Sequence, residues 1–375
     1  MATISLEEYR GHFSNAPGYL DFARYGPPSD LVRDASAASL ATASRGVADI
    51  DALKEHERAS LSIVARMTGR PSAESVTFAS STSAAITMVA LALAGGPRAQ
   101  VLVSPREFPA NIYPWVRAQR LGGPRVVWLD TPEGKVTPES VARVLSASTV
   151  ALVVSGVDFR TGYRADLGGL REVLGDRLLL VDAIQGFGSC DVDWSLADAV
   201  MAGGQKWLRA SWGTGFISLS SRAETHLGEG LAGWTAVEGP TRYDGEIHDT
   251  LTSAQRFSLT NGDLVAASRL RAALELLENV TVPVVHDAVR ASVRSLRDSL
   301  SRHGGETVVS LDDDELSGIV SFRLAHASPS RVHEHLARAG LQVTLHDSYV
   351  RASAHATTTS DTLEAFDAAL AELTP

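Results

Sequence analysis

A lysine stands in an apolar, glycine-containing segment near the middle of the chain. Residues 203–208 read GGQKWL, so Lys206 follows two glycines closely and precedes a tryptophan and a leucine. An ordinary surface lysine needs no such clearance, whereas glycines let a backbone pass close to a ligand. Apolar neighbours desolvate the root of the side chain, which favours the uncharged, nucleophilic amine. The segment therefore predicts a reactive lysine that can form a Schiff base with an aldehyde.

A carboxylate precedes this lysine at the end of an apolar run. The run RLLLVDAI (177–184) predicts a buried strand with Asp182 at its carboxyl end, the edge at which open α/β sheets bind ligands. A buried carboxylate needs a partner, because leaving it bare is costly. A helix cap or a salt bridge would meet that need as well as a ligand would, so this segment alone leaves both interpretations open.

Four consecutive hydroxyl residues, 80–83, lie between a predicted strand (75–81) and a predicted helix (82–95). Hydroxyls and free N–H groups at a helix N-terminus suit a phosphate. Plain N-capping explains the same residues, and the chain has neither a Walker pattern nor GxGxxG. Together, however, a phosphate site, an acidic group and a lysine are the protein parts needed to hold pyridoxal phosphate.

The bulk composition limits the possible partners. The chain has 375 residues, a formal net charge of −10, 44% hydrophobic residues and one cysteine. The negative charge argues against nucleic acid, and no apolar run approaches the ~20 residues that span a bilayer. The amino-terminal MATISLEEYRGHF lacks the basic start and apolar core of a signal peptide. We expect a cytoplasmic enzyme with no nucleic-acid or membrane partner and no metal site.

Two patterns divide the chain. Between about 75 and 220, short apolar runs alternate with amphipathic segments, which is typical of βαβ units around a mostly parallel sheet. After about 245, two long helices (262–279 and 285–304) precede a strand–helix–strand–helix pattern in which 341–354 is one strand. We therefore predict a large domain, 20–250, and a small α+β domain made of 1–19 and 251–375.

Four motifs give the chain a family resemblance. VDAIQGFG (181–188) followed by GGQKWLRASWGTGF (203–216) is the most specific, and EFPANIYPW (107–115) and VSGVDFRTG (154–162) match independently. The chain resembles the class V aminotransferase and cysteine desulfurase family, including its kynureninase and isopenicillin N epimerase-like branch. The resemblance implies the fold type I architecture of pyridoxal phosphate enzymes, with a mostly parallel seven-stranded sheet and a smaller C-terminal α+β domain. It also implies a homodimer.

The resemblance assigns cofactor-binding roles. Lys206 would form the Schiff base, Asp182 would bind the pyridinium nitrogen, and Gln185 would contact the ring hydroxyl. Phe108 would stack on the ring. The phosphate would be held by Ser81, Thr82, Ser83 and, in place of a histidine usual in desulfurases, Gln205.

Two arginines are candidates for binding the substrate. By resemblance, Arg351 would grip the α-carboxylate of an amino acid in a bidentate fork, although an arginine on a C-terminal strand can also serve only an ion pair. Arg24 stands where relatives often have alanine. It would either contact the substrate side chain or pair with an acid, and the sequence does not separate these two roles.

The expected reaction proceeds through a Cα carbanion. We predict β-elimination of the C–S lyase type, with class V transamination as the alternative and epimerisation or decarboxylation as further alternatives. Desulfurases need a mobile cysteine in the C-terminal third, whereas the single cysteine here, Cys190, follows the Asp182 strand. We expect Cys190 to be a small buried residue, which disfavours persulfide chemistry.

Overall fold

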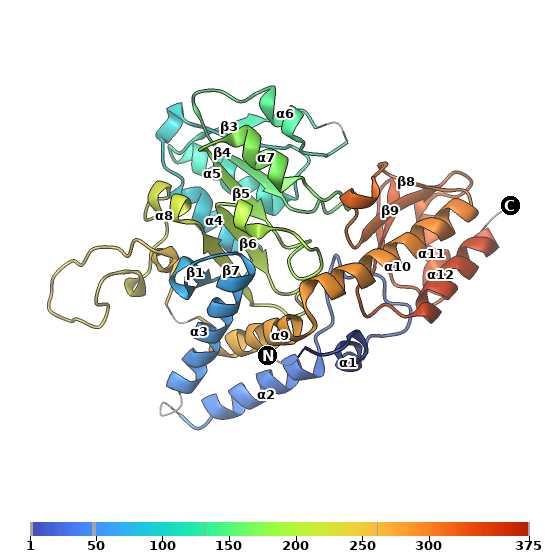
Figure 1. Cartoon of the computed structure of the whole chain (residues 1–375), viewed down its shortest axis with the longest axis horizontal. Coiled ribbons are helices and arrows are strands. Elements are labelled where there is room, and N and C mark those ends of the chain that lie inside the picture. Colours follow the sequence, from blue (N-terminus) through green and yellow to red (C-terminus); the bar gives the residue numbers. More distant parts are fainter. Residues whose placement is uncertain (1–2, 47–49, 132, 261, 374–375) are drawn as a thin grey trace.

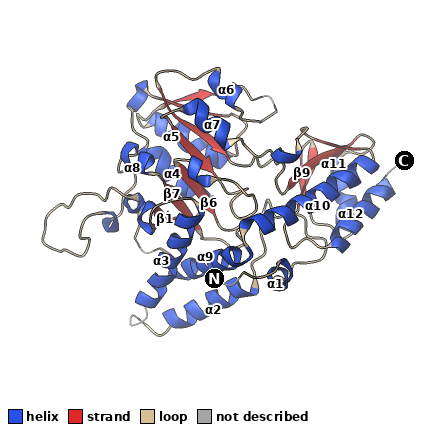
Figure 2. Cartoon of the chain, viewed as in Figure 1, coloured by secondary structure: helices blue, strands red, loops and turns tan. Residues whose placement is uncertain are grey.

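The computed structural model describes residues 3–46, 50–131, 133–260 and 262–373. Its larger sheet has seven strands in the order β1-β7-β6-β5-β4-β2-β3, with helices on both sides (Figures 1 and 2). The strands are β1 (Val76–Phe78), β2 (Gln100–Val103), β3 (Arg125–Trp128), β4 (Thr149–Ser155), β5 (Leu178–Asp182), β6 (Ala199–Gly203) and β7 (Gly215–Leu219).

This sheet is mostly parallel, as predicted. The pairs β2–β3, β2–β4, β4–β5 and β5–β6 are parallel, whereas β7 runs antiparallel to both β6 and β1. The central strands β5, β6 and β7 are buried along their whole length. Burial on both faces explains why β5 reads as a continuous apolar run rather than as an alternating one.

Successive residues of the central strands enter two separate cores. In β5, Leu178 and Leu180 pack with α4 (Thr82–Ala92), α5 (Tyr113–Arg120) and α8 (Ser221–His226). Leu179 and Val181 belong to the other core, with α3 (Ile50–Met67), α7 (Leu167–Leu174) and α9 (Leu264–Val280). The two-residue period of a strand thus builds a three-layer α/β/α arrangement.

A second, antiparallel sheet of four strands lies beside the first, in the order β10-β11-β9-β8. Its strands are β8 (Gly305–Thr307), β9 (Ile319–Leu324), β10 (Thr344–His346) and β11 (Tyr349–Ser353). The predicted single strand 341–354 is wrong: the chain turns at Asp347 and Ser348, both favoured turn residues, and His346 pairs with Tyr349 across that turn.

The remaining helices connect and cover these sheets. The helix α9 packs against α3 and α2 (Asp30–Ala43), whereas α10 (Val282–Arg302) packs on the small sheet with α12 (Ser360–Leu373). The helices α1 (Leu6–Gly11), α6 (Pro138–Ala142) and α11 (Pro329–Arg338) are also present, and α6 is the shortest of these three. The predicted domain division, 20–250 against 1–19 plus 251–375, stays a proposal.

The amino-terminal segment joins the small sheet. Tyr19 forms a bridge to Gln342 and Asp21 to Ser353, both in the parallel sense. A few residues later, the amide of Gly26 donates to the carbonyl of Gln205 at 2.9 Å. The segment from Tyr19 to Gly26 therefore runs from the small sheet to the loop that carries Lys206.

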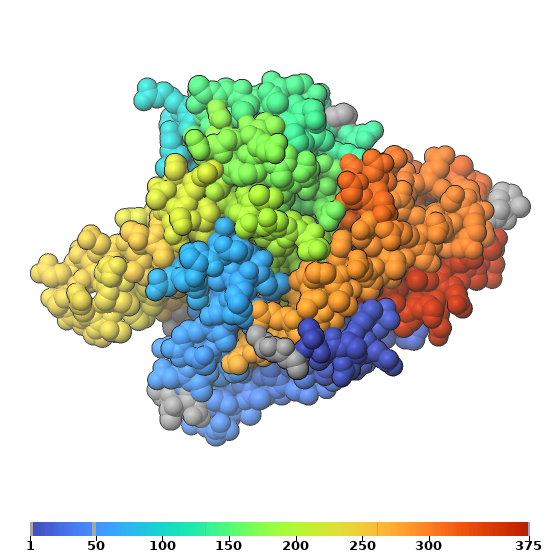
Figure 3. All heavy atoms as spheres, viewed as in Figure 1, coloured from blue at the N-terminus to red at the C-terminus, as the bar shows by residue number. Residues whose placement is uncertain are grey.

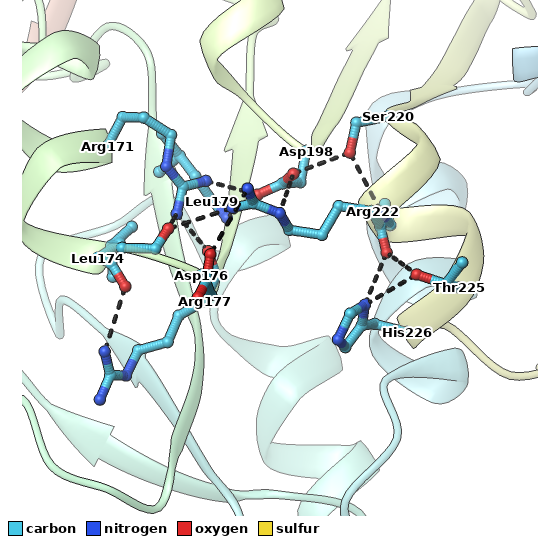
Figure 4. Close-up of polar contacts among 12 residues, drawn as sticks. Arg171, Leu174, Asp176, Arg177, Leu179, Asp198, Ser220, Arg222, Thr225 and His226 are labelled. Carbon is cyan, nitrogen blue, oxygen red and sulfur yellow. Dashed lines mark hydrogen bonds and ion pairs between the residues drawn. The ribbon is translucent and has the colours of Figure 1, made fainter.

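A buried carboxylate stabilises the amino end of the central strands (Figure 4). Asp198, directly before β6, accepts hydrogen bonds from the Leu179 amide at 2.9 Å, Arg171 Nη1 at 2.6 Å and Ser220 Oγ at 2.8 Å. A buried charge of this kind is tolerated because it is paired and hydrogen-bonded. The network fixes β5 and β6 at the edge of the sheet opposite Asp182 and Lys206.

Within the described ranges, none of the helices combines the length and the apolar character needed to span a membrane. The same residues contain no group of three or more His, Cys, Asp or Glu side chains arranged to hold a metal ion.

Candidate active site

Asp182 and Lys206 come from adjacent parallel strands. Asp182 is the last residue of β5 and pairs in register with Met201 of β6, and Lys206 follows the end of β6 by a short loop. Since parallel strands end at the same edge of a sheet, both side chains reach the edge where α/β ligands bind. The structure thus brings the two predicted catalytic residues together.

Burial shifts the pKa values of both groups, and the charge of each group opposes the shift of the other. Burial lowers the pKa of Lys206 to about 8, while the charge of Asp182 acts in the opposite direction. Burial raises the pKa of Asp182 to about 6, opposed by the Ile184 amide and by Lys206. Desolvation is the dominant cause for both. Lys206 is therefore an amine with a substantial neutral fraction near pH 8, as a nucleophile or a base requires.

Asp182 keeps one oxygen available. Its side chain is 3% exposed, and Oδ1 accepts from the Ile184 amide at 3.0 Å. Within the described part of the chain, Oδ2 takes part in no hydrogen bond, so it can still accept one from a bound group. A protonated pyridine nitrogen is a donor of the required kind.

The predicted phosphate residues surround the N-terminus of α4. Ser81 caps the helix by accepting from the Ala84 amide at 3.1 Å, and Thr82 Oγ1 accepts from the Gly203 amide at 2.8 Å. A Cβ added at Gly203 would lie against Gln205 Oε1 and 3.0 Å from Thr82 Oγ1. Thr82 and Gln205 are therefore neighbours beside free helix N–H groups, a site that suits a phosphate. Ser83 is exposed on the first turn.

The glycines around Lys206 also allow close packing within the protein. A Cβ at Gly204 would contact Thr214 Oγ1 and lie 2.9 Å from Ala210 Cβ, and a Cβ at Gly26 would contact the carbonyl of Lys206. These glycines let the Lys206 loop pack closely on neighbouring protein. Their predicted role in a close approach to a ligand stays a prediction.

An aromatic pair lies beside the Lys206 amine. Its Nζ is 5.7 Å from the centroid of the Phe108 ring, and Phe159 meets Phe108 edge-on at 5.1 Å. The Phe108 side chain is 44% exposed. An aromatic ring whose surface is open near the lysine is consistent with stacking on a flat, conjugated ligand.

Arg351 reaches the same region from the small sheet. It is 5% exposed, donates from Nη1 to the Phe159 carbonyl at 2.9 Å, and lies 3.8 Å from Asp21. Its Nε is buried without a partner among the described residues. The positive charge of Arg351 contributes to lowering the pKa of Lys206. A guanidinium with spare donors beside a reactive amine suits a carboxylate.

The structure also places Arg24 and Gln185, two further predicted site residues. Arg24 is exposed, and its charge acts on the pKa values of Asp21 and Arg351. Gln185 donates from Nε2 to the Ala23 carbonyl at 3.0 Å and accepts from Trp207 Nε1 at 2.8 Å. One N–H of the Gln185 amide is left for a ligand, so its predicted contact with a ring hydroxyl stays a proposal.

The sequence analysis missed two buried carboxylates. Asp21 faces Arg351 and accepts from Thr344 Oγ1 at 2.6 Å. Glu107 accepts from the Ser155 amide at 2.9 Å and from the Ser155 hydroxyl, and burial raises its pKa to about 7. Because Glu107 directly precedes Phe108, its bonds to the end of β4 position that ring. In the sequence, the position of Glu107 directly before Phe108 in the EFPAN motif was the signal that could have identified this carboxylate.

Cys190 is fully buried, as predicted. Burial raises the pKa of its thiol to about 11. A protonated, enclosed thiol is a poor nucleophile.

A family model, aminotransferase class-V, matches residues 32–364. The chain belongs to this family. Membership confirms the predicted fold type I architecture and the prediction of a pyridoxal phosphate-dependent enzyme. The family model covers every predicted site residue except Arg24, from Ser81 to Arg351.

One relative found by sequence and two solved structures are similar to this chain, and the solved structures share its fold. A probable cysteine desulfurase from Methanothermobacter thermautotrophicus is 24% identical over 266 residues, 70% of this chain and 65% of the relative, so the match spans under two thirds of that protein. A K223A mutant of C-DES with glycine covalently linked to its pyridoxal phosphate cofactor is 17% identical, with TM-score 0.88 and coverage of 99% and 100%. The cystine C-S lyase C-DES with its product cysteine persulfide is also 17% identical, with TM-score 0.87 and coverage of 96% and 98%.

Proposed function

We propose that this chain is a pyridoxal phosphate-dependent C–S lyase that catalyses β-elimination from a cysteine-derived amino acid. One observation supports this most directly: a lysine with a lowered pKa interacts electrostatically with both Asp182 and Arg351, while the only cysteine is buried with a raised pKa. Two relatives point the same way, a probable cysteine desulfurase and a cystine C-S lyase.

The residues present fit the cofactor. Lys206 would supply the amine for its aldehyde, and the open Oδ2 of Asp182 would accept from its ring nitrogen. Thr82 and Gln205 flank a helix N-terminus that would suit its phosphate. When bound, pyridoxal phosphate supplies an electron sink for negative charge that develops at the substrate Cα. Phe108 offers an aromatic surface beside the lysine.

The chain's own groups then have defined tasks. Arg351 binds the α-carboxylate and orients the amino acid. Lys206, once its amine is free, takes the Cα proton as a general base. Asp182 would hold the proton on the ring nitrogen of the bound cofactor, which would help the cofactor withdraw the negative charge that develops at Cα. With a sulfur substituent on Cβ, the electron pair left at Cα forms a Cα–Cβ double bond as the C–S bond breaks, and the sulfur leaves as a thiolate that takes up a proton. Addition of water then gives pyruvate and ammonia.

The test is direct. The holoenzyme is mixed with S-methyl-cysteine, and methanethiol, pyruvate and ammonia are measured. We expect all three in equal amounts. Absence of thiol, together with keto acid formed in stoichiometric amount and accumulation of pyridoxamine phosphate, would instead support transamination. That alternative is favoured by the family description itself. Epimerisation would show as racemised amino acid without thiol.

We also propose that two copies of the chain associate through a projecting segment, residues 228–253. Figures 1 and 3 show this segment, in yellow, extending away from the sheets. It carries exposed apolar side chains, including Trp234 at 53%, Tyr243 at 87% and Ile247 at 99%. Exposed apolar side chains gathered on one extension are typical of an interaction surface.

Light scattering after size-exclusion chromatography tests the dimer. We expect the mass of two chains for the native protein and a mass nearer one chain for Tyr243→Asp with Ile247→Asp. The control is Leu121→Asp, at a position that is 76% exposed but lies directly after α5, outside the projecting segment. A native protein with the mass of one chain would disprove the association.

A further inference from the structure

The guanidinium of Arg160 has unused hydrogen-bonding capacity. Its Nε and Nη2 are both buried without a hydrogen-bond partner among the described residues. The ion pair to Asp158 is long, at 3.5 Å, and Oδ1 of that carboxylate already accepts from the amides of Arg160 and Thr161. Buried polar groups are rarely left unpaired, since each costs free energy. A ligand that accepts hydrogen bonds would remove that cost.

Arg160 belongs to the region of the candidate active site. Its guanidinium carbon is 5.8 Å from the ring centroid of Phe159, which meets Phe108 edge-on at 5.1 Å. The carbonyl of Phe159 accepts from Arg351, and the carbonyl of Arg160 accepts from Ser321 Oγ. Consecutive residues of this loop therefore contact the small sheet beside the substrate-binding arginine.

One face of the small sheet turns further donors toward this loop. Tyr349 and Arg351 are two residues apart in β11 and share a face, and His346 is the cross-strand partner of Tyr349. Both Arg160 and Arg351 act on the pKa of Tyr349, which burial raises. Arg351 Nε and His346 Nε2 are, like two of the Arg160 nitrogens, buried and without a partner in the described structure. Several unsatisfied nitrogens thus gather in one place.

These unpaired nitrogens outnumber the hydrogen bonds that one α-carboxylate needs. A planar carboxylate accepts two parallel bonds from a single guanidinium, and Arg351 alone provides them. A second arginine with two unpaired nitrogens calls for a second acceptor. Arg24, Arg160 and Arg351 outnumber the carboxylates of Asp21 and Asp158 beside them, which favours an anion. The departing part of a cysteine thioether is the portion of the proposed substrate that varies, so it is the part that can carry this anion.

We propose that Arg160 binds a second carboxylate, in the sulfur substituent of the substrate, so that the preferred substrates are cysteine thioethers with an acidic side chain. This inference rests on the proposed C–S lyase function for the identity of the substrate. Arg351 holds the α-carboxylate, and Arg160 selects the leaving group by its charge.

Two compounds of nearly equal shape test the proposal. S-(2-carboxyethyl)-cysteine ends in a carboxylate, and S-(2-carbamoylethyl)-cysteine ends in the neutral amide. The equilibrium dissociation constant of each is measured with holoenzyme from the change in cofactor absorbance, and kcat/KM is measured from pyruvate release. We expect native holoenzyme to bind the carboxylate compound at least about tenfold more tightly, the effect of one charge-assisted hydrogen bond.

The variants separate recognition from folding. Arg160→Gln keeps much of the side-chain volume and should reduce the preference to less than about twofold, with binding of the amide compound unchanged. Arg331→Ala, on the exposed face of α11, is the control and should keep the native preference. Arg160→Lys, which keeps the charge, should retain part of it. If Arg160→Gln unfolds, the folded Arg160→Lys variant takes its place in the test. Loss of half or more of the preference for the carboxylate compound in that variant would then support recognition by Arg160.

Equal binding of the two compounds by native enzyme would overturn the proposal, and so would an Arg160→Gln variant that keeps the native preference. Binding that depends on Arg160, with no pyruvate from either compound, would support the anion subsite and reject the lyase function. The two proposals therefore fail separately.

Discussion

Trp207 donates a hydrogen bond from its indole nitrogen to Gln185 Oε1 at 2.8 Å. The bond joins the loop after β5 to the loop after β6, and so connects the neighbourhoods of Asp182 and Lys206. Trp207 is only 2% exposed and packs against Gly318, where an added Cβ would clash with its ring. The separation of carboxylate and amine is therefore fixed by protein contacts.

Replacement of Trp207 by Phe tests this connection. It removes the indole donor, keeps an aromatic ring, and leaves Gln185 Oε1 buried without its partner. We expect a loss of about 1–3 kcal/mol in the free energy of unfolding and weaker retention of the cofactor on dialysis. Trp128→Phe, at an exposed position on the edge strand β3, should change neither. Unchanged stability in Trp207→Phe would show that the bond contributes little.

The lowered pKa of Lys206 predicts how cofactor capture depends on pH. Burial favours the neutral amine, so the reactive fraction should rise with pH through about 8 rather than through the ordinary value of 10.5. Cofactor-free protein is mixed with pyridoxal phosphate, and growth of the Schiff-base absorbance is followed from pH 6 to 10. Butylamine measured alongside corrects for titration of the aldehyde itself.

Lys206→Ala should show no such absorbance, and borohydride should add no cofactor mass to its peptide. Lys135→Ala, which removes an ion pair with Glu315 far along the chain, should behave as native. A capture profile with a midpoint near 10 would contradict the burial argument.

Asp182→Asn should separate cofactor binding from catalysis. The substitution keeps the shape of the side chain but removes the negative charge that stabilises a protonated ring nitrogen. We expect kcat to fall by about 10²–10³-fold, while Lys206 still binds the cofactor. The check is kcat together with the absorbance of the purified variant. A variant with native kcat would exclude the assigned role of Asp182.

Arg351→Lys should raise KM for every amino-acid substrate. A lysine keeps the charge but loses the planar fork, and it also loses the contact with the Phe159 carbonyl. We expect kcat/KM to fall by about 10²-fold, with cofactor absorbance unchanged. If Arg351 serves only its ion pair with Asp21, then Asp21→Asn and Arg351→Lys should lower stability equally without altering KM.

The network at the opposite edge of the sheet should affect stability alone. Asp198→Ala leaves Arg171 without its carboxylate and the Leu179 amide without its acceptor. Breaking a buried pair in this way should cost about 3–5 kcal/mol. Chemical denaturation measures the loss, and the remaining folded protein should keep native kcat. A loss below 1 kcal/mol would show that water replaces the carboxylate.

The sequence predicted what depends on local pattern. Continuous apolar runs identified β5 and its neighbours and placed Asp182 at the carboxyl end of a strand, the edge to which the structure also brings Lys206. The hydroxyl run marked the start of α4 because capping is a local interaction. The boundaries of α9 and α10 also followed from local periodicity, within a few residues.

Long-range contacts escaped prediction for a physical reason. Asp21 and Arg351 are brought together only by the amino-terminal segment pairing with β11, and no local pattern encodes that pairing. The oxygen and the nitrogen of the Gln185 side-chain amide each form a hydrogen bond with a residue of another segment. The sequence analysis did not predict the turn at Asp347 and Ser348. Residues with high β-propensity stand on both sides of this turn, so the hairpin resembles a single strand in the sequence.

The segment from Tyr19 to Gly26 has a mechanical consequence. The Leu20 amide donates to the Gln342 carbonyl, and the Leu20 carbonyl accepts from the Ser353 amide. Six residues later, the Gly26 amide donates to the carbonyl of Gln205, which precedes Lys206. Six residues of backbone therefore tie the strand that carries Arg351 to the loop that carries Lys206, and main-chain hydrogen bonds at both ends set the spacing between the two.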